Sequence, residues 1–378
     1  MFRYRVTLFS LFGFKVSVDA SWLLLAVLIT WSLAVGYFPQ TAPGLPKETY
    51  WWLGVAGLIG FAFSIVFHEL SHSLVARRFD MPIRGITLFV FGGVAEMEDE
   101  PPGAKAEFWM AIAGPLMSFF LAFVFFLLGG LFVGPDAAKP TPLAVLFGLL
   151  AYVNTVLGVF NLVPAFPLDG GRVLRAALWY WKGDIGWATR VAATAGSIFG
   201  FVLIAIGLFN VVVGNFVGGL WWFLIGLFLR AAAGAEATRQ IARSTLSGLP
   251  VSRFMSADVI AVPPELPLGR LIEDYFYHHY FTSFPVSRDG RLIGCVSLKA
   301  VKAAAADHPE IRTVESVMEA CPDNQTVGPD ADSAKALRQM QMAGVSRLFV
   351  TRNDRLVGIL ALRDLLTFLA IKAELSEP

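Results

Sequence analysis

Residues 51–75, WWLGVAGLIGFAFSIVFHELSHSLV, decide the fold class because they combine the length of a membrane span with a cluster of ionisable side chains. A bilayer-spanning helix needs ~20 predominantly apolar residues, and this run supplies them. Inside it stands His68-Glu69-Leu70-Ser71-His72. Ionisable groups at membrane depth are costly and usually face a polar interior or a functional site. The stretch therefore predicts a membrane helix that carries such a site.

The composition of the whole chain extends this reading. Of its 378 residues 56% are hydrophobic and only 16% are charged, which is too apolar for an ordinary soluble protein. Together with 51–75, further apolar runs bring the expected number of spans to about six: 21–37, 108–133, 142–163, 187–213 and 216–233. No small-residue cleavage pattern follows the first run, which favours a retained span over a signal peptide.

Basic residues mark one side of these predicted spans. They precede the first span and follow the second, fourth and sixth: Arg3, Arg5, Lys15, Arg77, Arg78, Arg84, Arg172, Arg175, Lys182, Arg230, Arg239 and Arg243. The positive-inside rule then predicts a multi-pass protein with both termini in the cytosol, and we expect it in the plasma membrane. A net charge of +1 gives no reason to expect a nucleic-acid partner. Cys295 and Cys321 form neither a disulfide framework nor a zinc site in this reading.

A short β-rich segment, GITLFVFGGVAEM at 85–97, separates the second and third runs. It is too short to span a bilayer, too apolar for a solvated loop, and broken by Gly92 and Gly93. We expect a β-hairpin that dips into the membrane beside protein. The composition becomes mixed and polar near Thr245, which predicts a membrane domain at 1–240 and a soluble domain at 245–378.

The soluble region repeats itself. FPVSRDGRLIG at 284–294 aligns with LFVTRNDRLVG at 348–358, each reading as two strands joined by a turn and followed by a helical stretch. Met255 and Met318 open the two copies, about 251–305 and 314–370. The pattern resembles a tandem pair of CBS domains. That resemblance implies a soluble α/β module that commonly binds adenine nucleotides in the cleft between the repeats.

The H-E-x-x-H motif predicts a metal site. His68 and His72, four residues apart on a helix, share one face and can bind one zinc ion, with Glu69 placed to act on its water. A polar patch in a helix bundle is the alternative reading. A catalytic zinc usually takes three protein ligands, and the other histidines, His278, His279 and His308, lie in the soluble region. The third ligand must then be a carboxylate.

Asp169, in NLVPAFPLDGG at 161–171, is the best candidate for that carboxylate. Pro164 and Pro167 break the helix and present Asp169 as the fourth span ends. His72 lies five residues before Arg77 and Asp169 three before Arg172, so both are expected on the cytosolic side. The competing acids, which stand in a charge run typical of a solvated loop, are Glu96, Glu98 and Asp99.

These two motifs together resemble the site-2 protease family of intramembrane metallopeptidases over residues 1–235. The resemblance implies that His68, His72 and Asp169 hold zinc and that Glu69 is the catalytic general base. Ala113-Gly-Pro-Leu-Met-Ser118 matches the family's G-x-x-x-N/S/G element, although small residues at this spacing also simply let helices approach. Asn154 and Asn161, seven residues apart on one helical face, are candidates to orient the substrate or oxyanion, or to bond between helices.

The expected fold is therefore a helical membrane bundle of about six spans with a membrane-associated β-hairpin, followed by a soluble α/β tandem CBS module. The expected activity is hydrolysis of a peptide bond in a membrane-spanning protein substrate, with one Zn²⁺ per chain. A helical substrate must unwind first, and the strand edge at 86–94, including Val90 and Val94, offers a place for it to lie extended.

The role of the CBS module stays open at this point. In CBS pairs a Ser/Thr followed three residues later by Asp commonly holds the nucleotide ribose; here Ser297-Leu-Lys-Ala300 and Ala361-Leu-Arg-Asp364 each keep one half. Ser297 and Asp364 are thus candidate nucleotide-binding residues, and a structural or homodimerising role is the alternative. The module is expected to gate the cytosolic entrance to the zinc site. Rival readings of the whole chain are a CBS-regulated transporter or channel and a catalytically inactive metallopeptidase-like scaffold.

Overall fold

The computed structural model describes residues 5–81, 83–89, 92–97, 101–133, 141–304 and 312–376. The chain divides into two compact units, Met1–Thr238 and Arg239–Pro378.

The described chain contains six helical segments long and apolar enough to cross a membrane, as predicted. The first joins α1 (Ser21–Ser32), the π-helical η1 (Leu33–Tyr37) and α2 (Phe38–Thr41). The other five are α3 (Lys47–Arg78), α4 (Ala104–Leu131), α5 (Pro142–Asn161), α7 (Ile185–Val212) and α8 (Phe216–Leu246). Between α5 and α7 lies the shorter α6 (Asp169–Lys182), which is outside these six segments. The chain is a multi-pass integral membrane protein.

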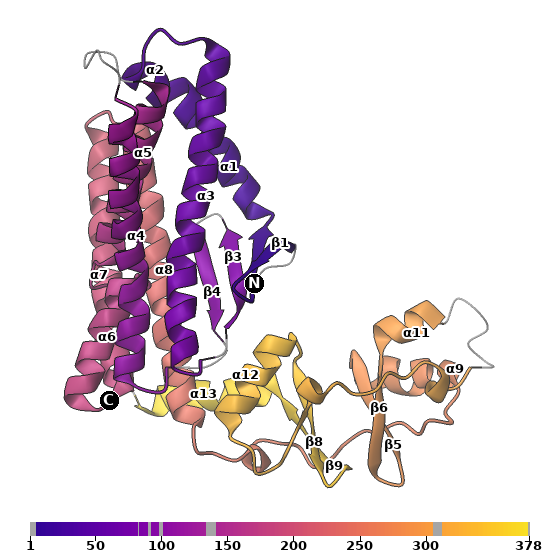
Figure 1. The fold of residues 1–378 in the computed structure, drawn as a ribbon. Coiled ribbons are helices and arrows are strands. Elements are labelled where there is room, and N and C mark those ends of the chain that lie inside the picture. The colour runs from indigo at the N-terminus through magenta and orange to yellow at the C-terminus, as the bar shows by residue number, and fades with distance from the viewer. Residues whose placement is uncertain are drawn as a thin grey trace. The chain divides into compact units, whose positions relative to one another are not determined.

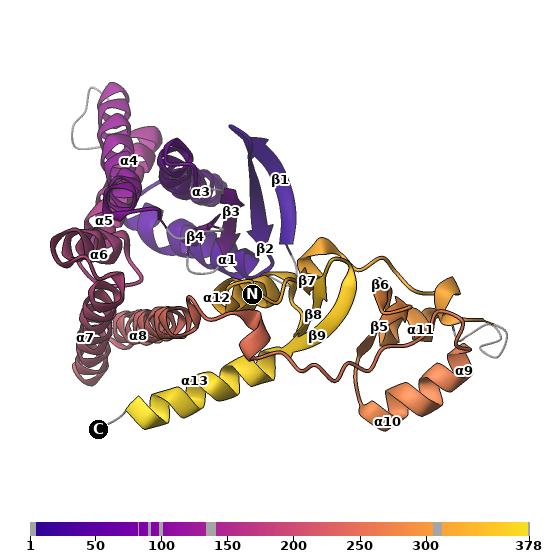
Figure 2. The same cartoon turned by 90° about the horizontal axis from the view of Figure 1, so that it is seen from below.

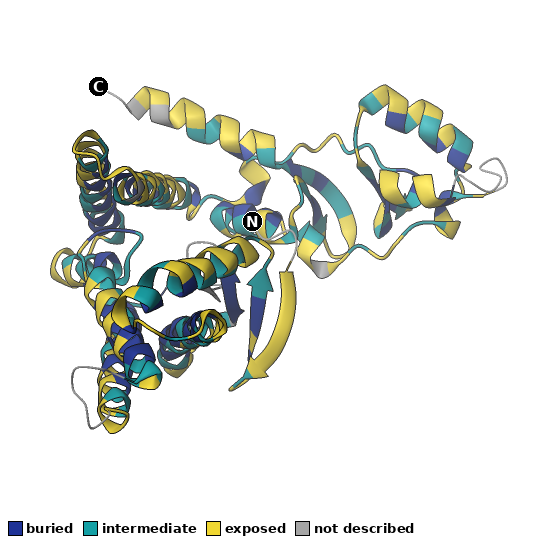
Figure 3. Cartoon of the chain, turned by 90° about the horizontal axis from the view of Figure 1, so that it is seen from above, coloured by how far each residue is buried: buried dark blue, intermediate teal, exposed yellow. Residues whose placement is uncertain are grey.

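The membrane helices expose large apolar side chains and bury small ones. Phe120 and Phe126 of α4 are 59% and 69% exposed, and Figure 3 shows the exposed residues along the outer faces of the bundle. Glycines mark the contact between α7 and α8: a Cβ on Gly200 would lie 2.8 Å from the Gly226 carbonyl oxygen. Lipid can cover the outer faces, and close backbone approach holds the helices together.

A four-stranded sheet packs beside α3, with strand order β1-β2-β3-β4 (Figures 1 and 2). Its strands are β1 (Arg5–Leu11), β2 (Phe14–Asp19), β3 (Ile83–Phe89) and β4 (Gly92–Met97). The predicted hairpin is present as β3 and β4, but it is half of a larger sheet, because β2 pairs in parallel with β3. Apolar residues of β2 and β3 pack on the buried face of α3: Val16 and Leu88 form one buried cluster with Ile65 and Val66.

The second unit holds a five-stranded sheet of order β5-β6-β9-β8-β7. Its strands are β5 (Ser283–Arg288), β6 (Arg291–Ser297), β7 (Thr326–Val327), β8 (Arg347–Arg352) and β9 (Arg355–Ala361). Its helical segments are η2 (Val251–Arg253), α9 (Leu268–Arg270), η3 (Leu271–Phe276), α10 (Tyr277–His279), α11 (Leu298–Ala304), η4 (Val314–Ser316), η5 (Asp323–Gln325), α12 (Ser333–Ala343) and α13 (Leu362–Ser376).

The two sequence repeats fold alike and exchange their opening segments. The hairpins β5–β6 and β8–β9 share one burial pattern, and each has a register shift at the same place. Ser256, which opens the first repeat, bridges Ile359 on β9, whereas Glu319 of the second bridges Cys295 on β6. Each repeat therefore completes the other, and the pair forms one module.

Candidate metal centre

Helix α3 brings the two motif histidines onto one buried face. His68 and His72 are only 4% and 8% exposed, and their Nε2 atoms lie 3.2 Å apart. The helix forms here because the surrounding run is apolar and contains no proline, and a spacing of four residues stacks side chains one turn apart. The prediction that these imidazoles share a face is confirmed.

The Asp169 carboxylate reaches the same point from a different part of the chain. Asp169 is the first residue of α6, and its Oδ2 lies 3.0 Å from His68 Nε2 and 3.2 Å from His72 Nε2. The three donor atoms all lie within 4.8 Å of one another. A metal ligand at this position would be the ionised carboxylate.

Two glycines after Asp169 make this placement possible. The chain turns between Asn161, where α5 ends, and Asp169, so α6 begins directly against residues 162–166. A Cβ on Gly170 would lie 2.3 Å from the Val163 carbonyl oxygen, and one on Gly171 would lie 2.4 Å from the Phe166 nitrogen. The Asp-Gly-Gly sequence is therefore required by the close approach of backbone to backbone.

Helix α4 orients both imidazole rings through their Nδ1 atoms, on the side of each ring away from the metal site. His72 Nδ1 lies 2.6 Å from the Met110 carbonyl oxygen, and His68 Nδ1 lies 2.8 Å from Ser118 Oγ. A carbonyl oxygen only accepts, so His72 Nδ1 donates, and in the neutral ring Nε2 keeps its lone pair for a metal. Ligating histidines usually have such a partner on the second ring nitrogen. Ser118 therefore does more than allow helix packing.

Gly114 keeps the space beside the donor atoms clear. It lies on α4 between Met110 and Ser118, and a Cβ there would lie 2.2 Å from His72 Nε2 and 2.6 Å from His68 Nε2. Any larger residue would press on both nitrogens. Two imidazole nitrogens and one carboxylate oxygen converge here, and the Met110 carbonyl fixes the tautomer of His72. This donor set fits a zinc ion with one position left open.

Glu69 faces the edge of the sheet. The residue is half-buried, and the backbone of β4 lies against it: a Cβ on Gly93 would be 2.8 Å from Glu69 Cγ and 3.3 Å from Oε1. The catalytic candidate therefore lies between the histidines that flank it in α3 and the outermost strand of the described sheet.

The two candidate asparagines make helix contacts. Asn154 is fully buried, and its Nδ2 donates to Ser64 Oγ and to the Leu150 carbonyl oxygen, each at 2.8 Å. Asn161 Nδ2 donates to the Leu157 carbonyl oxygen of its own helix at 3.0 Å. The contact of Asn154 with Ser64 matches the alternative of bonding between helices, whereas the Asn161 contact stays within α5. Of the competing acids, Glu98 and Asp99 lie outside the described residues, as does the side chain of Glu96.

Sequence reasoning missed a buried ion pair close to this centre. Glu107 on α4 is fully buried, and Arg175 on α6 is 4% exposed and donates to it. Arg175 entered the sequence reading only as one of the basic residues that follow the fourth span. An acidic residue at the start of an apolar run was the available signal, since a carboxylate there needs a partner.

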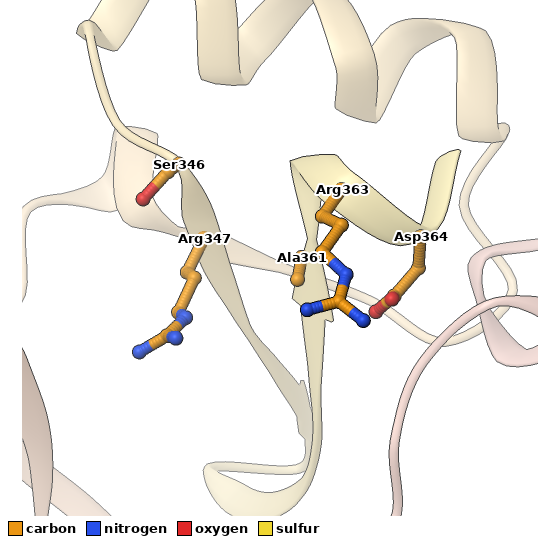
Figure 4. A pocket seen from close by; sticks show the side chains of 5 residues that line it. All are labelled: Ser346, Arg347, Ala361, Arg363 and Asp364. Atoms are coloured by element: carbon orange, nitrogen blue, oxygen red, sulfur yellow. The ribbon is translucent and has the colours of Figure 1, made fainter. Parts of the chain in front are cut away.

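In the second unit a cavity of about 290 Å³ opens beside β8 and β9. It is lined by Ser346, Arg347, Ala361, Arg363 and Asp364, and Figure 4 shows Asp364 and the two arginine side chains around it. Ser297 does not line this cavity; its Oγ accepts a hydrogen bond from the Ala300 nitrogen at 3.2 Å and so caps α11.

Comparison with known proteins gives consistent results. The model of peptidase family M50 matches residues 56–142 and 135–206, and the CBS domain model matches residues 251–307 and 314–371. A Mycobacterium tuberculosis protein named as a zinc metalloprotease, Rip3, is 36% identical over 96% of this chain and 92% of its own length. A zinc metalloprotease of Methanocaldococcus jannaschii is 29% identical over 99% of this chain and all of its own length.

Among solved structures, the site-2 protease from Methanocaldococcus jannaschii covers 62% of this chain and 95% of its own, with 30% identity and a TM-score of 0.43. The fold, the donor set and the similar sequences define a membrane metalloprotease with a tandem CBS module. The chain belongs to peptidase family M50, the site-2 proteases.

Proposed function

We propose that this metalloprotease binds one zinc ion through His68, His72 and Asp169 and cleaves membrane-spanning proteins within or beside the bilayer. The observation that carries the proposal is the convergence of three donor atoms within 4.8 Å: two buried imidazole nitrogens on the membrane helix α3 and the partly buried carboxylate of Asp169 on α6. Glu69 lies next to the histidines in α3. A transporter pathway gives no reason for this convergence. An inactive scaffold gives no reason for a carboxylate in the position of Glu69.

The residues divide the work of hydrolysis between them. Zinc, when bound, supplies an electrophile and makes water reactive at neutral pH. Glu69 takes a proton from the attacking water and passes it to the nitrogen of the leaving amine. The Met110 carbonyl and Ser118 Oγ keep both rings in orientation during the reaction. Asp169, at the start of α6, supplies the third ligand.

The substrate is proposed to dock on β4. In the described sheet β4 pairs with β3 only, so its other edge has free backbone donors and acceptors. That edge runs past Glu69, because Gly93 lies against this side chain. A helical span hides its carbonyls in hydrogen bonds, and pairing with an edge strand would hold it unwound. The proposed substrates are proteins with one span.

The proposed topology puts both termini in the cytosol of a cell whose plasma membrane holds the protein. The CBS module is proposed to gate the protease in response to an adenine nucleotide in the cavity at Asp364. This location is favoured over the first repeat because Asp364 lines a cavity together with two arginines, which suit a phosphate. Homodimerisation through the module is the second role that we propose for it.

Metal analysis tests the centre without a known substrate. Full-length protein in detergent is analysed by mass spectrometry as wild type and as His68→Ala and Asp169→Ala variants. We expect nearly one zinc per wild-type chain and a clear loss in both variants. Wild-type protein without metal after careful preparation would remove the enzyme proposal and favour the transporter.

Cleavage is tested by comparing membranes of cells that produce wild type or Glu69→Gln. New peptide termini are sought by mass spectrometry, and we expect some within or next to single spans in wild type alone. The Glu69→Gln variant should still bind zinc. Identical termini in both samples, with zinc present, would instead favour the inactive scaffold.

A further inference from the structure

A buried arginine joins the helix of Asp169 to the helix behind the histidines. Arg175 Nε donates to Glu107 Oε1 at 2.6 Å, and its NH2 also contacts that oxygen. The Glu107 side chain is fully buried and that of Arg175 is 5% exposed. Charges at such depth are tolerated only when paired, and an arginine fork bonded to a carboxylate has a defined direction as well as strength. The pair thus fixes how α6 lies against α4.

The same guanidinium also touches the segment that precedes Asp169. Arg175 Cζ lies 5.1 Å from the ring centroid of Phe166, a residue in the turn between α5 and α6. Arg175 follows Asp169 by six residues, and Phe166 precedes it by three. Arg175 lies in the helix that follows Asp169 and contacts the turn that precedes it, so it links the two segments on either side of this ligand. A third contact, NH1 to Glu236 Oε1 on α8, is longer at 3.7 Å and more exposed.

Helix α4 connects these contacts to the histidines. Glu107 lies one turn before Met110, whose carbonyl oxygen accepts from His72. Ser118, further along the same helix, bonds His68. The two histidines and, through Arg175, the helix of Asp169 are all held by α4. The positions of all three donor atoms therefore depend on contacts with the same helix, α4.

We infer that Arg175, anchored by Glu107, is a positioning residue that places the Asp169 carboxylate against the two histidines. This inference rests on the proposed metal site. It predicts that Arg175 affects metal binding through Asp169 and not through the histidines. It also predicts that Glu107, close and buried, matters more than Glu236, distant and partly exposed.

The test measures zinc affinity of the full-length protein in detergent, by competition with a chelator. We expect Arg175→Met and Glu107→Gln to weaken zinc binding by about 10- to 100-fold, the range seen for outer partners of metal ligands. Glu236→Gln should change it less than about threefold. Arg190→Met, which removes an exposed arginine of α7, is the matched control and should bind as wild type.

Two further readouts separate positioning from a general effect on the fold. In cobalt-substituted protein, the visible spectrum of Arg175→Met should resemble that of Asp169→Ala. The affinity losses of Arg175→Met and Asp169→Ala should also not add in the double variant, because both remove the same ligand. If Arg175→Met does not fold, Arg175→Lys keeps the charge without the fork, and it should still bind zinc more weakly than wild type.

Two outcomes would overturn the inference while the metal site itself stands. Wild-type affinity in Arg175→Lys and Glu107→Gln would show that the fork does not position the ligand. Fully additive losses with Asp169→Ala would show that Arg175 acts elsewhere. Failure of the proposed function looks different: wild type would then bind no zinc, or Asp169→Ala would bind it normally, and the inference would fall with the metal site.

Discussion

Gly93 of β4 lies so close to Glu69 of α3 that a methyl group on Gly93 would be 2.8 Å from Glu69 Cγ. Because Cγ is only two bonds from the Cα of Glu69, this part of the side chain has little room to move away from β4. The edge strand and the catalytic candidate are therefore set at a fixed distance. A substrate strand paired with β4 would pass this carboxylate at a constant depth.

Gly93→Ala should reduce turnover and leave zinc in place. The added methyl group would push Glu69 aside, and a displacement of about 1 Å in a catalytic group can cost about 100-fold in rate. Turnover and metal content are measured on the same preparation. Gly103→Ala is the control, because nothing lies within 4 Å of a Cβ there. Normal turnover in Gly93→Ala would show that Glu69 is not held by β4.

Val94→Pro tests the docking edge. Val94 lies in β4 opposite Thr87, and proline removes its N–H from the strand. We expect turnover to fall about tenfold, the value of one or two backbone hydrogen bonds, with zinc content unchanged. Leu8→Pro in β1, at a register shift of the opposite outer strand, is the control. Val90, the other position in the predicted edge, lies outside the described residues. Unchanged cleavage by Val94→Pro would rule out strand addition at this point.

Gly114→Ala should abolish metal binding without unfolding the bundle. Its methyl group would lie 2.2 Å from His72 Nε2, a distance that no packing adjustment accommodates while both rings keep their bonds to α4. Gly130→Ala on the same helix meets nothing within 4 Å and should bind zinc normally. Zinc content and thermal unfolding of both variants decide the matter. Full zinc occupancy in Gly114→Ala would mean that the metal lies elsewhere.

The sequence predicted the spans, the repeats and the meeting of His68 with His72, because length, hydropathy and spacing along one helix are local properties. It did not predict that β2 joins β3, since pairing between strands so far apart depends on how α3 packs. The ion pair of Glu107 with Arg175 was missed for the same reason. The position of Glu107 at the start of an apolar run signals that it needs a partner, but only the packing of α6 on α4 shows that the partner is Arg175.

The cavity at Asp364 leads to a prediction for nucleotide binding. Calorimetric titration with AMP and with ATP should show binding to wild type, and Asp364→Asn should weaken it about tenfold by removing a charged acceptor for ribose hydroxyls. Ser297→Ala should have little effect, because that hydroxyl caps α11. Absence of heat in wild type with both nucleotides would leave the structural or dimerising role for the module.

Asp332 should control the stability of the second repeat in a pH-dependent way. Its carboxylate accepts hydrogen bonds from the backbone nitrogens of Ala334 and Lys335, which begin α12, and from Gly248 before the first repeat. Burial raises the pKa of Asp332, but these three hydrogen bonds lower it more, so the pKa in the folded protein lies below its ordinary value. The unfolded chain therefore binds the proton more readily than the folded one.

The stabilisation by Asp332 is then fully present above the unfolded pKa of about 3.9 and is lost as the pH falls through the lower folded value. Replacing a helix cap costs ~1 kcal/mol, so Asp332→Ala should make the amides of α12 exchange about fivefold faster with deuterium at pH 6. At an acid pH below the folded pKa the difference from wild type should shrink, because the wild-type carboxyl is then protonated. Asp330→Ala, which removes an exposed carboxylate nearby, is the control. A difference of equal size at both pH values would mean that the charge of Asp332 contributes nothing and that its side chain acts only by packing.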